Sequence, residues 1–466
     1  MSQQSISTNR ASYIFSLIKT AIRGEEHDYT KGSLRMAVIL LAIPMILEMM
    51  MESVFAVVDI FFVGKLGKEA ISTVVLTETF LTLLYSAAIA FSVGATAMVA
   101  RRVGEKNFDA AAKAGAQAIN LGWMVAVVIS IIGVVYARDV LQLMGASESV
   151  LAIGVSYTRV VFGSSVVILL LFLINGVFRG AGNASIAMKS LWVANGCNIV
   201  LCPLLIHFFG LTGAAIATSI GRGLGVCFQL YHLFKGNKTL SIRSVHFTID
   251  WHIIKSLFQI SWVGFVQFFI ASASWIVLAR IMSSFGNDAA IAGYGVAIRI
   301  IMFFLLPAWG MSNAAATLVG QNLGANDPER AERAVWLTAR YNAIFMATVM
   351  VIFLVFAEMI VQFMNKDVQV EVYAVEALRI ISLGYVFYGV GMVMANTFNG
   401  AGDTRTPTII NLFGFWAFQI PLAYLLAIVL DFGPTGVFIA IPVAETAITI
   451  AAFLTFRKGK WKKVKV

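Results

Sequence analysis

Long apolar segments recur so often along this chain of 466 residues that they decide which folds it can adopt. Windows of about 20 apolar residues, enough helix to cross ~30 Å of hydrocarbon, occur twelve times. They cover approximately residues 34–63, 70–99, 115–137, 150–175, 185–208, 211–234, 252–281, 288–318, 334–362, 374–398, 406–430 and 434–456. Only 12% of the residues are charged, against about a quarter in soluble domains. The chain is therefore predicted to be an all-α membrane protein with twelve transmembrane helices.

Basic residues are distributed unevenly between these segments. Of the 34 Lys and Arg residues, 25 lie in the N-terminal arm, every second loop and the C-terminal tail or within the first two turns of an adjoining span, and five lie in the opposite loops. The positive-inside rule then predicts that both termini are cytoplasmic, in a plasma (inner) membrane. The net charge of +10 reflects this topology, so no nucleic-acid partner is expected. Residues 11–23 are expected to form an amphipathic surface helix, and Trp461 to lie among lipid headgroups.

An internal repeat divides the chain. The segment Phe178–Asn183, FRGAGN, recurs 220 residues later as Phe398–Asp403, FNGAGD. At the same offset Gly104 matches Gly324. The glycines of both motifs are expected to provide the positive φ of a sharp turn. The repeat therefore predicts two homologous halves of six helices each.

The two halves have the same orientation in the membrane because six is an even number, so a pseudo-two-fold axis along the membrane normal relates them. A slip of three residues aligns 211–214 with 434–437 in the last helix of each half. The predicted domains are a cytoplasmic arm at 1–33, a six-helix bundle at 34–234, a cytoplasmic linker at 235–251, a second six-helix bundle at 252–456 and a basic tail at 457–466.

Three carboxylates interrupt the first apolar segment, Ile43–Gly64. Each carboxylate costs roughly 2.5–3.5 kcal/mol near a bilayer centre, so such groups normally face a protein interior. Glu48, Glu52 and Asp59 are four and seven residues apart, which places them on nearly one helix face. This face is predicted to line an internal cavity. The alternative is that the glutamates extend toward the headgroups and that the aspartate is only hydrogen-bonded.

Several motifs together resemble the multidrug and toxic compound extrusion (MATE) family. They are VVDIFFVGKLG at the end of the first helix, the paired turns RGAGN and NGAGDTRTPT, and WGMSNAAATLVGQNLGA at the end of the eighth helix. The resemblance covers essentially the whole chain. It implies a V-shaped pair of six-helix bundles that exports organic cations and other xenobiotics in exchange for inward Na⁺ or H⁺.

The resemblance also implies a coupling site. Asp59 matches the first-helix aspartate of the family, whose protonation or Na⁺ ligation is thought to release the drug. Asn198 and Thr218 match polar positions that complete a cation site in one branch, and Tyr157 matches a nearby aromatic residue. That branch has a second aspartate where this chain has Cys202. A buried thiol is a poor ligand for hard cations, so Asp59 is the one candidate for holding Na⁺.

Other polar residues within the spans are candidates for a cavity lining. They are Glu48, Glu52, Glu78, Cys202, Gln267 and Tyr388. Glu445 is expected to be a structural hydrogen-bond partner, and buried arginines such as Arg222 are expected to pair with the glutamates. A second branch of the family carries carboxylates at the positions of Ala271 and Tyr388, so coupling through the second half is not expected here.

Cysteine and histidine spacings match no metal site or hydrolytic grouping, so neither an enzyme nor a cofactor is expected. The only small ligands expected are the coupling ion, H⁺ or Na⁺, and drug-like molecules. The chain is expected to act as a monomer in the lipid bilayer. Two alternatives remain: a flippase for lipid-linked sugars, whose cavities tend to be lined by Arg and Lys, and a passive channel or membrane scaffold.

Overall fold

The computed structural model describes residues 10–25 and 27–464, and every regular element in this part of the chain is a helix. The first half contains α1 (Arg10–Arg23), α2 (Leu34–Gly64), α3 (Lys68–Gly104), α4 (Phe108–Val135), α5 (Ala137–Leu143), α6 (Glu148–Gly163), α7 (Ser165–Gly180), α8 (Ala184–Phe209) and α9 (Leu211–Lys235). The short η1 (Ser244–Phe247) lies in the linker between the halves.

The second half repeats this order, but a single helix, α12, stands in place of α4 and α5, and two π-helical segments interrupt the eleventh span of the chain. It contains α10 (Trp251–Ser283), α11 (Asp288–Gly324), α12 (Pro328–Met364), α13 (Val368–Ser382), α14 (Tyr385–Ala401), α15 (Arg405–Asn411), η2 (Leu412–Gln419), α16 (Ile420–Tyr424), η3 (Leu425–Val429), α17 (Pro434–Arg457) and η4 (Lys460–Lys463). Here η2 and η3 are the π-helical segments and η4 is a 3₁₀ turn.

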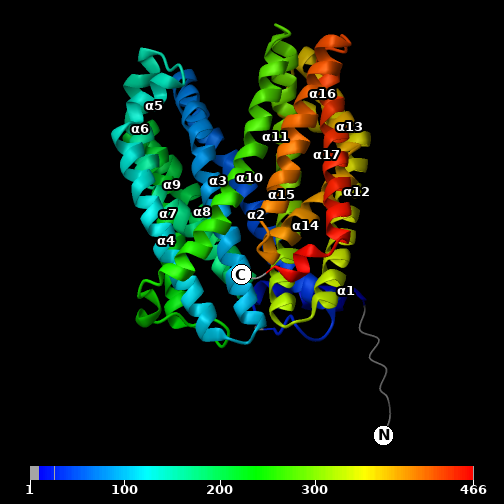
Figure 1. The fold of residues 1–466 in the computed structure, drawn as a ribbon. Coiled ribbons are helices and arrows are strands. Elements are labelled where there is room, and N and C mark those ends of the chain that lie inside the picture. The colour runs from blue at the N-terminus through cyan, green and yellow to red at the C-terminus, as the bar shows by residue number, and fades with distance from the viewer. Residues whose placement is uncertain (1–9, 26, 465–466) are drawn as a thin grey trace.

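The helices form two bundles that meet at one end of the molecule and diverge toward the other (Figure 1). The end at which the bundles meet also carries α1 and η4, and we call it the sealed end. Among the described residues, eleven helices are long and apolar enough to span a membrane, and the bent pair of α13 and α14 makes a twelfth. The predicted fold of two six-helix bundles is therefore confirmed.

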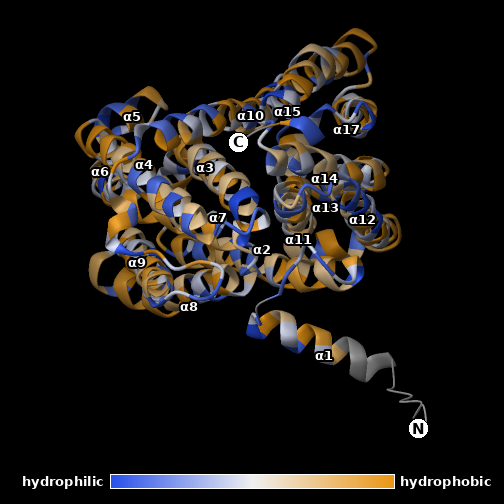
Figure 2. Cartoon of the chain, turned by 60° about the horizontal axis from the view of Figure 1, so that its bottom comes forward, coloured by the Kyte–Doolittle hydropathy of each residue, from blue (hydrophilic) through white to orange (hydrophobic). Residues whose placement is uncertain are grey.

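Both termini of the described chain lie at the sealed end. Helix α1 confirms the short helix expected in the arm, and it lies beside the bundles rather than within them (Figure 2). Trp461 does not lie among lipid headgroups as expected; it is 1% exposed and stacks on Phe456 of α17. Residues 1–9 of the predicted arm and 465–466 of the predicted tail lie outside the described residues.

The internal repeat is also visible in the backbone conformation of individual residues. Gly182 and Gly402, which occupy equivalent places in the two glycine motifs, have φ values of +85° and +87°. The three-residue slip is also visible, because Gly210 and Gly433 precede the last helix of each half with φ values of +56° and +57°. The turns therefore need glycine for the reason that the sequence predicts.

Glycines bring the two bundles into backbone contact at the sealed end. Gly104 ends α3 and Gly324 ends α11, and the repeat relates them to each other. A Cβ atom added to Gly104 would overlap the carbonyl oxygen of Gln321, and one added to Gly324 would overlap that of Arg101. The contact is therefore symmetric, and side chains larger than hydrogen do not fit into it. We call this contact the seam.

Side chains beside the seam tie each bundle to the glycine motif of the other. Gln321 of α11 donates from Nε2 to the carbonyl oxygen of Gly180, 3.0 Å away, at the end of α7. Its repeat partner Arg101 of α3 donates from Nη2 to the carbonyl oxygen of Ala401, at 3.4 Å, at the end of α14. These reciprocal hydrogen bonds reinforce the closed state of this end.

The N-terminal arm also joins the two bundles. Asp28 pairs with Lys106, which follows α3, at 2.8 Å. Burial raises the pKa of Asp28, but hydrogen bonds from Lys106 and Thr30 outweigh it and lower the pKa to about 2. The arm is therefore held by a charged pair throughout the physiological pH range. On the other side, the guanidinium of Arg330 in α12 donates to the backbone carbonyls of Tyr29, Lys31 and Gly32.

Replacing Gly104 or Gly324 with alanine should destabilise the protein by about 1–3 kcal/mol, because the added methyl group overlaps a carbonyl oxygen of the opposite bundle. The thermal unfolding midpoint of the purified protein measures this effect. Gly64→Ala is the matched control, since Gly64 also ends a spanning helix and nothing lies within 4 Å of its added Cβ atom. Equal midpoints for all three variants would contradict a tight seam.

Candidate functional site

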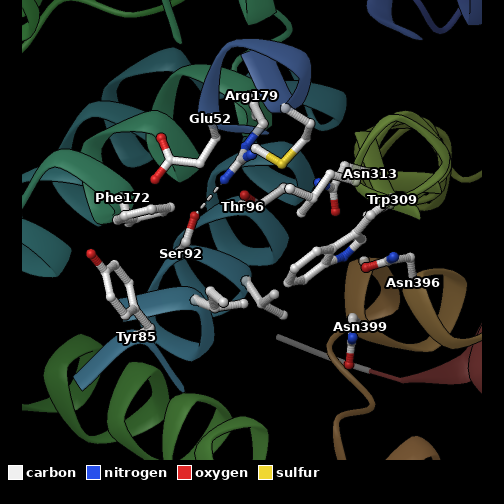
Figure 3. Close-up of a pocket in the computed structure, with 16 residues that line it drawn as sticks. Glu52, Tyr85, Ser92, Thr96, Phe172, Arg179, Trp309, Asn313, Asn396 and Asn399 are labelled. Carbon is white, nitrogen blue, oxygen red and sulfur yellow. Dashed lines mark hydrogen bonds between the residues drawn. The ribbon is translucent and has the colours of Figure 1, made fainter. Parts of the chain in front are cut away.

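A pocket of about 270 Å³ lies between the two bundles (Figure 3). Helices α2, α3 and α7 of the first bundle and α11 and α14 of the second supply its walls. Its lining residues are Met49, Glu52, Tyr85, Ile89, Ser92, Val93, Thr96, Phe172, Arg179, Leu306, Trp309, Asn313, Ala316, Asn396, Asn399 and Gly400. The lining is mostly apolar with a few polar side chains, which is typical of small-molecule sites.

The pocket lies on the axis that relates the two halves. Four pairs of its lining residues are separated by the repeat offset of 220 positions, namely Ile89 and Trp309, Val93 and Asn313, Thr96 and Ala316, and Arg179 and Asn399. The backbone surrounding the pocket is thus nearly symmetric, but its chemistry is not. The first bundle contributes aliphatic groups and a guanidinium where the second contributes an indole and amides.

The glutamates of α2 do not present free carboxylates to this pocket. Glu48 is 1% exposed and is absent from the lining. Its Oε1 atom accepts a hydrogen bond from Asn175 of α7 at 2.9 Å and lies 3.5 Å from Nη1 of Arg179. Arg179 also donates from Nη2 to the hydroxyl of Ser92 at 2.7 Å. Glu48 therefore belongs to a polar network inside the first bundle.

Glu52 lines the pocket, but both of its carboxylate oxygens are already bonded to the first bundle. Oε1 accepts from Nη2 of Arg222 at 2.7 Å, and Oε2 accepts from Nδ2 of Asn195 at 3.0 Å. Arg222 is 2% exposed, and its guanidinium lies 5.3 and 5.5 Å from the ring centroids of Phe55 and Phe172. The expected pairing of Arg222 with a glutamate is therefore present, and it neutralises Glu52.

Asp59 points into the first bundle instead of into the pocket. Its Oδ1 atom lies 3.9 Å from Sγ of Cys202 in α8, and it makes no other hydrogen bond or ion pair with a described residue. The side chain is only partly exposed. Asp59 is therefore the carboxylate of α2 that lacks a compensating arginine in direct contact.

The other residues of the predicted coupling site lie around Asp59. Asn198 precedes Cys202 by one turn of α8, and its Nδ2 donates to the hydroxyl of Thr218 in α9 at 2.9 Å. The Oδ1 atom of Asn198 is buried without a partner in the described chain. Tyr157 of α6 and Glu78 of α3 both lie within electrostatic range of Asp59. The structure thus gathers these residues in the first bundle.

The remaining cavity candidates lie outside the pocket between the bundles. Gln267 of α10 is 3% exposed, and Tyr388 faces a separate small cavity in the second bundle together with Glu445. Of the six candidates only Glu52 lines the pocket. The expectation depended on an acidic cavity surface, whereas Glu48 and Glu52 pair with Arg179 and Arg222, and Glu78 is exposed on α3 outside the pocket lining.

Sequence reasoning missed most of the polar lining. Arg179 and Asn399 occupy the second position of the two glycine motifs, which were interpreted only as turns. Trp309, Asn313 and Asn396 also line the pocket. The signal that would have found Arg179 and Asn399 is the repeat itself. Two residues that are 220 positions apart face each other where they lie near the two-fold axis. A polar residue at such a position does not face the lipid, so it indicates a polar site between the halves.

Comparison with known proteins places this architecture in a family. The family model described as MatE matches residues 44–204 and 264–425, once in each half. The probable multidrug resistance protein YoeA of Bacillus subtilis is 24% identical over 94% of this chain and 96% of its own length. The multidrug export protein MepA of Staphylococcus haemolyticus is 25% identical over 91% of this chain and 93% of its own length.

Solved structures have the same fold. The crystal structure of a MATE protein in complex with MaL6 superposes with a TM-score of 0.89 at 24% identity, and covers 94% of this chain and 99% of that protein. A MATE structure in the straight conformation has a TM-score of 0.88 at 25% identity and covers 94% of this chain. Two family matches, full-length relatives and a shared fold show that this chain belongs to the MatE (multidrug and toxic compound extrusion) family of membrane transporters.

Proposed function

We propose that this protein is a secondary active multidrug exporter that exchanges drug-like amphiphiles, organic cations among them, for inward H⁺ or Na⁺. The observation that carries the proposal is the pocket between two bundles that are sealed on one side by the seam. Transporters built from such repeats bind cargo between the halves and expose it to each side in turn. The names of the relatives, multidrug resistance and multidrug export proteins, support the same activity.

The distribution of charge supports an orientation. The sealed end carries the basic arm and tail, which by the positive-inside rule face the cytoplasm of a cell whose plasma membrane holds the protein. In that orientation the structure is closed toward the cytoplasm and its bundles diverge toward the outside (Figure 1). This state would release cargo outward. We propose that the protein acts as a monomer, since each chain contains both halves of the pocket.

Coupling is proposed to run through α2. Met49 and Glu52 of this helix line the pocket, and Asp59 lies seven residues further on, roughly 10 Å along the axis. An ion or proton bound at Asp59 and cargo bound in the pocket therefore contact the same rigid helix. If the two favour different positions of α2, binding of one weakens binding of the other, which is the linkage that exchange requires.

A flippase for lipid-linked sugars is the less favoured alternative. The pocket contains one arginine and no lysine among its described lining residues, and two glutamates lie beside it. A pyrophosphate group would need more positive charge than this.

Asp59→Asn should abolish efflux of ethidium driven by an imposed proton or sodium gradient, because the amide neither binds a proton nor attracts a cation at this position. Sealed vesicles with the two gradients imposed separately provide the measurement and also identify the coupling ion. Glu358→Gln is the control, because Glu358 is an exposed carboxyl that pairs with Arg379 away from the pocket. Efflux at the wild-type rate in a folded Asp59→Asn variant would refute the proposed role of Asp59.

Cys202→Asp should create or strengthen Na⁺ dependence of transport. The new carboxylate would replace a thiol that lies 3.9 Å from Asp59, and two carboxylates offer the hard oxygen ligands that Na⁺ prefers. Transport at several sodium concentrations and fixed pH measures the change. Cys202→Ser should leave ion dependence as it is, and an unchanged Cys202→Asp variant would show that this contact is not the ion site.

A further inference from the structure

The pocket between the bundles is not an acidic cavity, although the acids of α2 predict one. Glu52 is its single carboxylate, and both oxygens accept hydrogen bonds from Arg222 and Asn195 on the side of the first bundle. Neither oxygen is left to attract a cationic ligand without breaking a buried ion pair. The polarity of the pocket is therefore set by its other groups.

The strongest of these groups is the guanidinium of Arg179. The residue is 8% exposed and lines the pocket, with its side chain directed toward Ser92 and Thr96 (Figure 3). Its hydrogen bond to Ser92 is short, at 2.7 Å, but its approach to Glu48 is long, at 3.5 Å. A guanidinium has five N–H donors, so Arg179 retains donors for a ligand.

The opposite wall offers further hydrogen-bonding groups that have no partner. Asn399 is 2% exposed, and its Oδ1 atom is buried without a hydrogen bond. Asn313 and the indole N–H of Trp309 make no hydrogen bond to any described residue, and both side chains line the pocket (Figure 3). An asparagine side chain can turn over and present its NH₂ group instead of its oxygen. A ligand with acceptor oxygens would satisfy these groups together with Arg179.

Aromatic rings provide the remaining recognition surface. Tyr85 and Phe172 of the first bundle face the cavity across from Trp309 of the second (Figure 3). Met49 and Leu306 add further apolar side chains to the lining. A flat aromatic body would fit between these walls, with its polar end at Arg179 and the asparagines.

We propose that this pocket binds aromatic carboxylates, with the carboxylate on the Arg179 guanidinium and the Asn399 and Asn313 amides, and the ring between Tyr85 and Trp309. Charge-assisted and bidentate contacts of this kind are among the strongest hydrogen bonds to a carboxylate. The ligand would contact both bundles, so its affinity also depends on how closely the two bundles approach each other. That such anions are exported depends on the proposed transport function, whereas their binding does not.

Binding to the purified full-length protein tests this proposal with two probes that share one ring system. The probes are 2-naphthoate and 2-naphthylmethylammonium, measured by calorimetry. The wild type should bind the carboxylate at least about tenfold more tightly than the ammonium, the change expected from one charge-assisted hydrogen bond. Arg179→Gln should weaken carboxylate binding by about the same factor, and Asn365→Ala, outside the pocket, should leave it unchanged.

Arg179 also contacts Glu48, and its replacement leaves that buried carboxylate without its arginine, so Asn313→Leu is the second variant. Asn313 lines the pocket and makes no hydrogen bond to a described residue, and its replacement should weaken carboxylate binding several-fold with little effect on stability. A preference for the ammonium, equal affinities, absence of binding, or wild-type carboxylate affinity in both variants would overturn the proposal. Carboxylate binding without any ion-driven efflux would instead contradict the transport function and leave the binding site intact.

Discussion

The contact between backbones at the seam is the constraint on which the rest of the structure depends. Gly104 and Gly324 let α3 and α11 approach until peptide groups touch, and no side chain separates the bundles there. The reciprocal bonds of Gln321 and Arg101, the N-terminal arm and the pocket are all arranged around this contact. Because the seam is symmetric, a small rotation about the axis would separate both of its halves together, as the proposed alternation of access requires.

Two of the three acids on α2 form ion pairs with arginines of the first bundle. Arg179 lies beside buried Glu48 and Arg222 beside partly exposed Glu52, so both glutamates are compensated. Asp59, by contrast, has a thiol as its hydrogen-bond partner and no arginine in direct contact. This difference separates structural acids from a candidate functional one on the same helix. Membership in a transporter family also confirms that the chain is not an enzyme.

Much of the fold could be predicted from the sequence because its determinants are local or periodic. Apolar length places the spans, and the repeat offset places the halves and even the positive φ of Gly182 and Gly402. The site was harder to predict. Which side of α2 the acids face depends on Arg179, whose side chain comes from a turn motif 131 residues away from Glu48. No helical periodicity encodes such a pairing, and of the three acids only Glu52 lines the pocket, whose other polar side chains include the Arg179 guanidinium and three asparagine amides.

The separation of Asp59 from the pocket has a consequence for how efficiently ion movement would be coupled to cargo movement. In the proposed exchange, an ion at Asp59 and cargo in the pocket would not overlap, so the tightness of coupling would depend on the stiffness of the helix between them. From Met49 to Asp59 this helix contains no glycine or proline that would let it flex. A bend introduced there would leave both compartments intact and still allow slippage, in which ions run downhill while cargo stays behind.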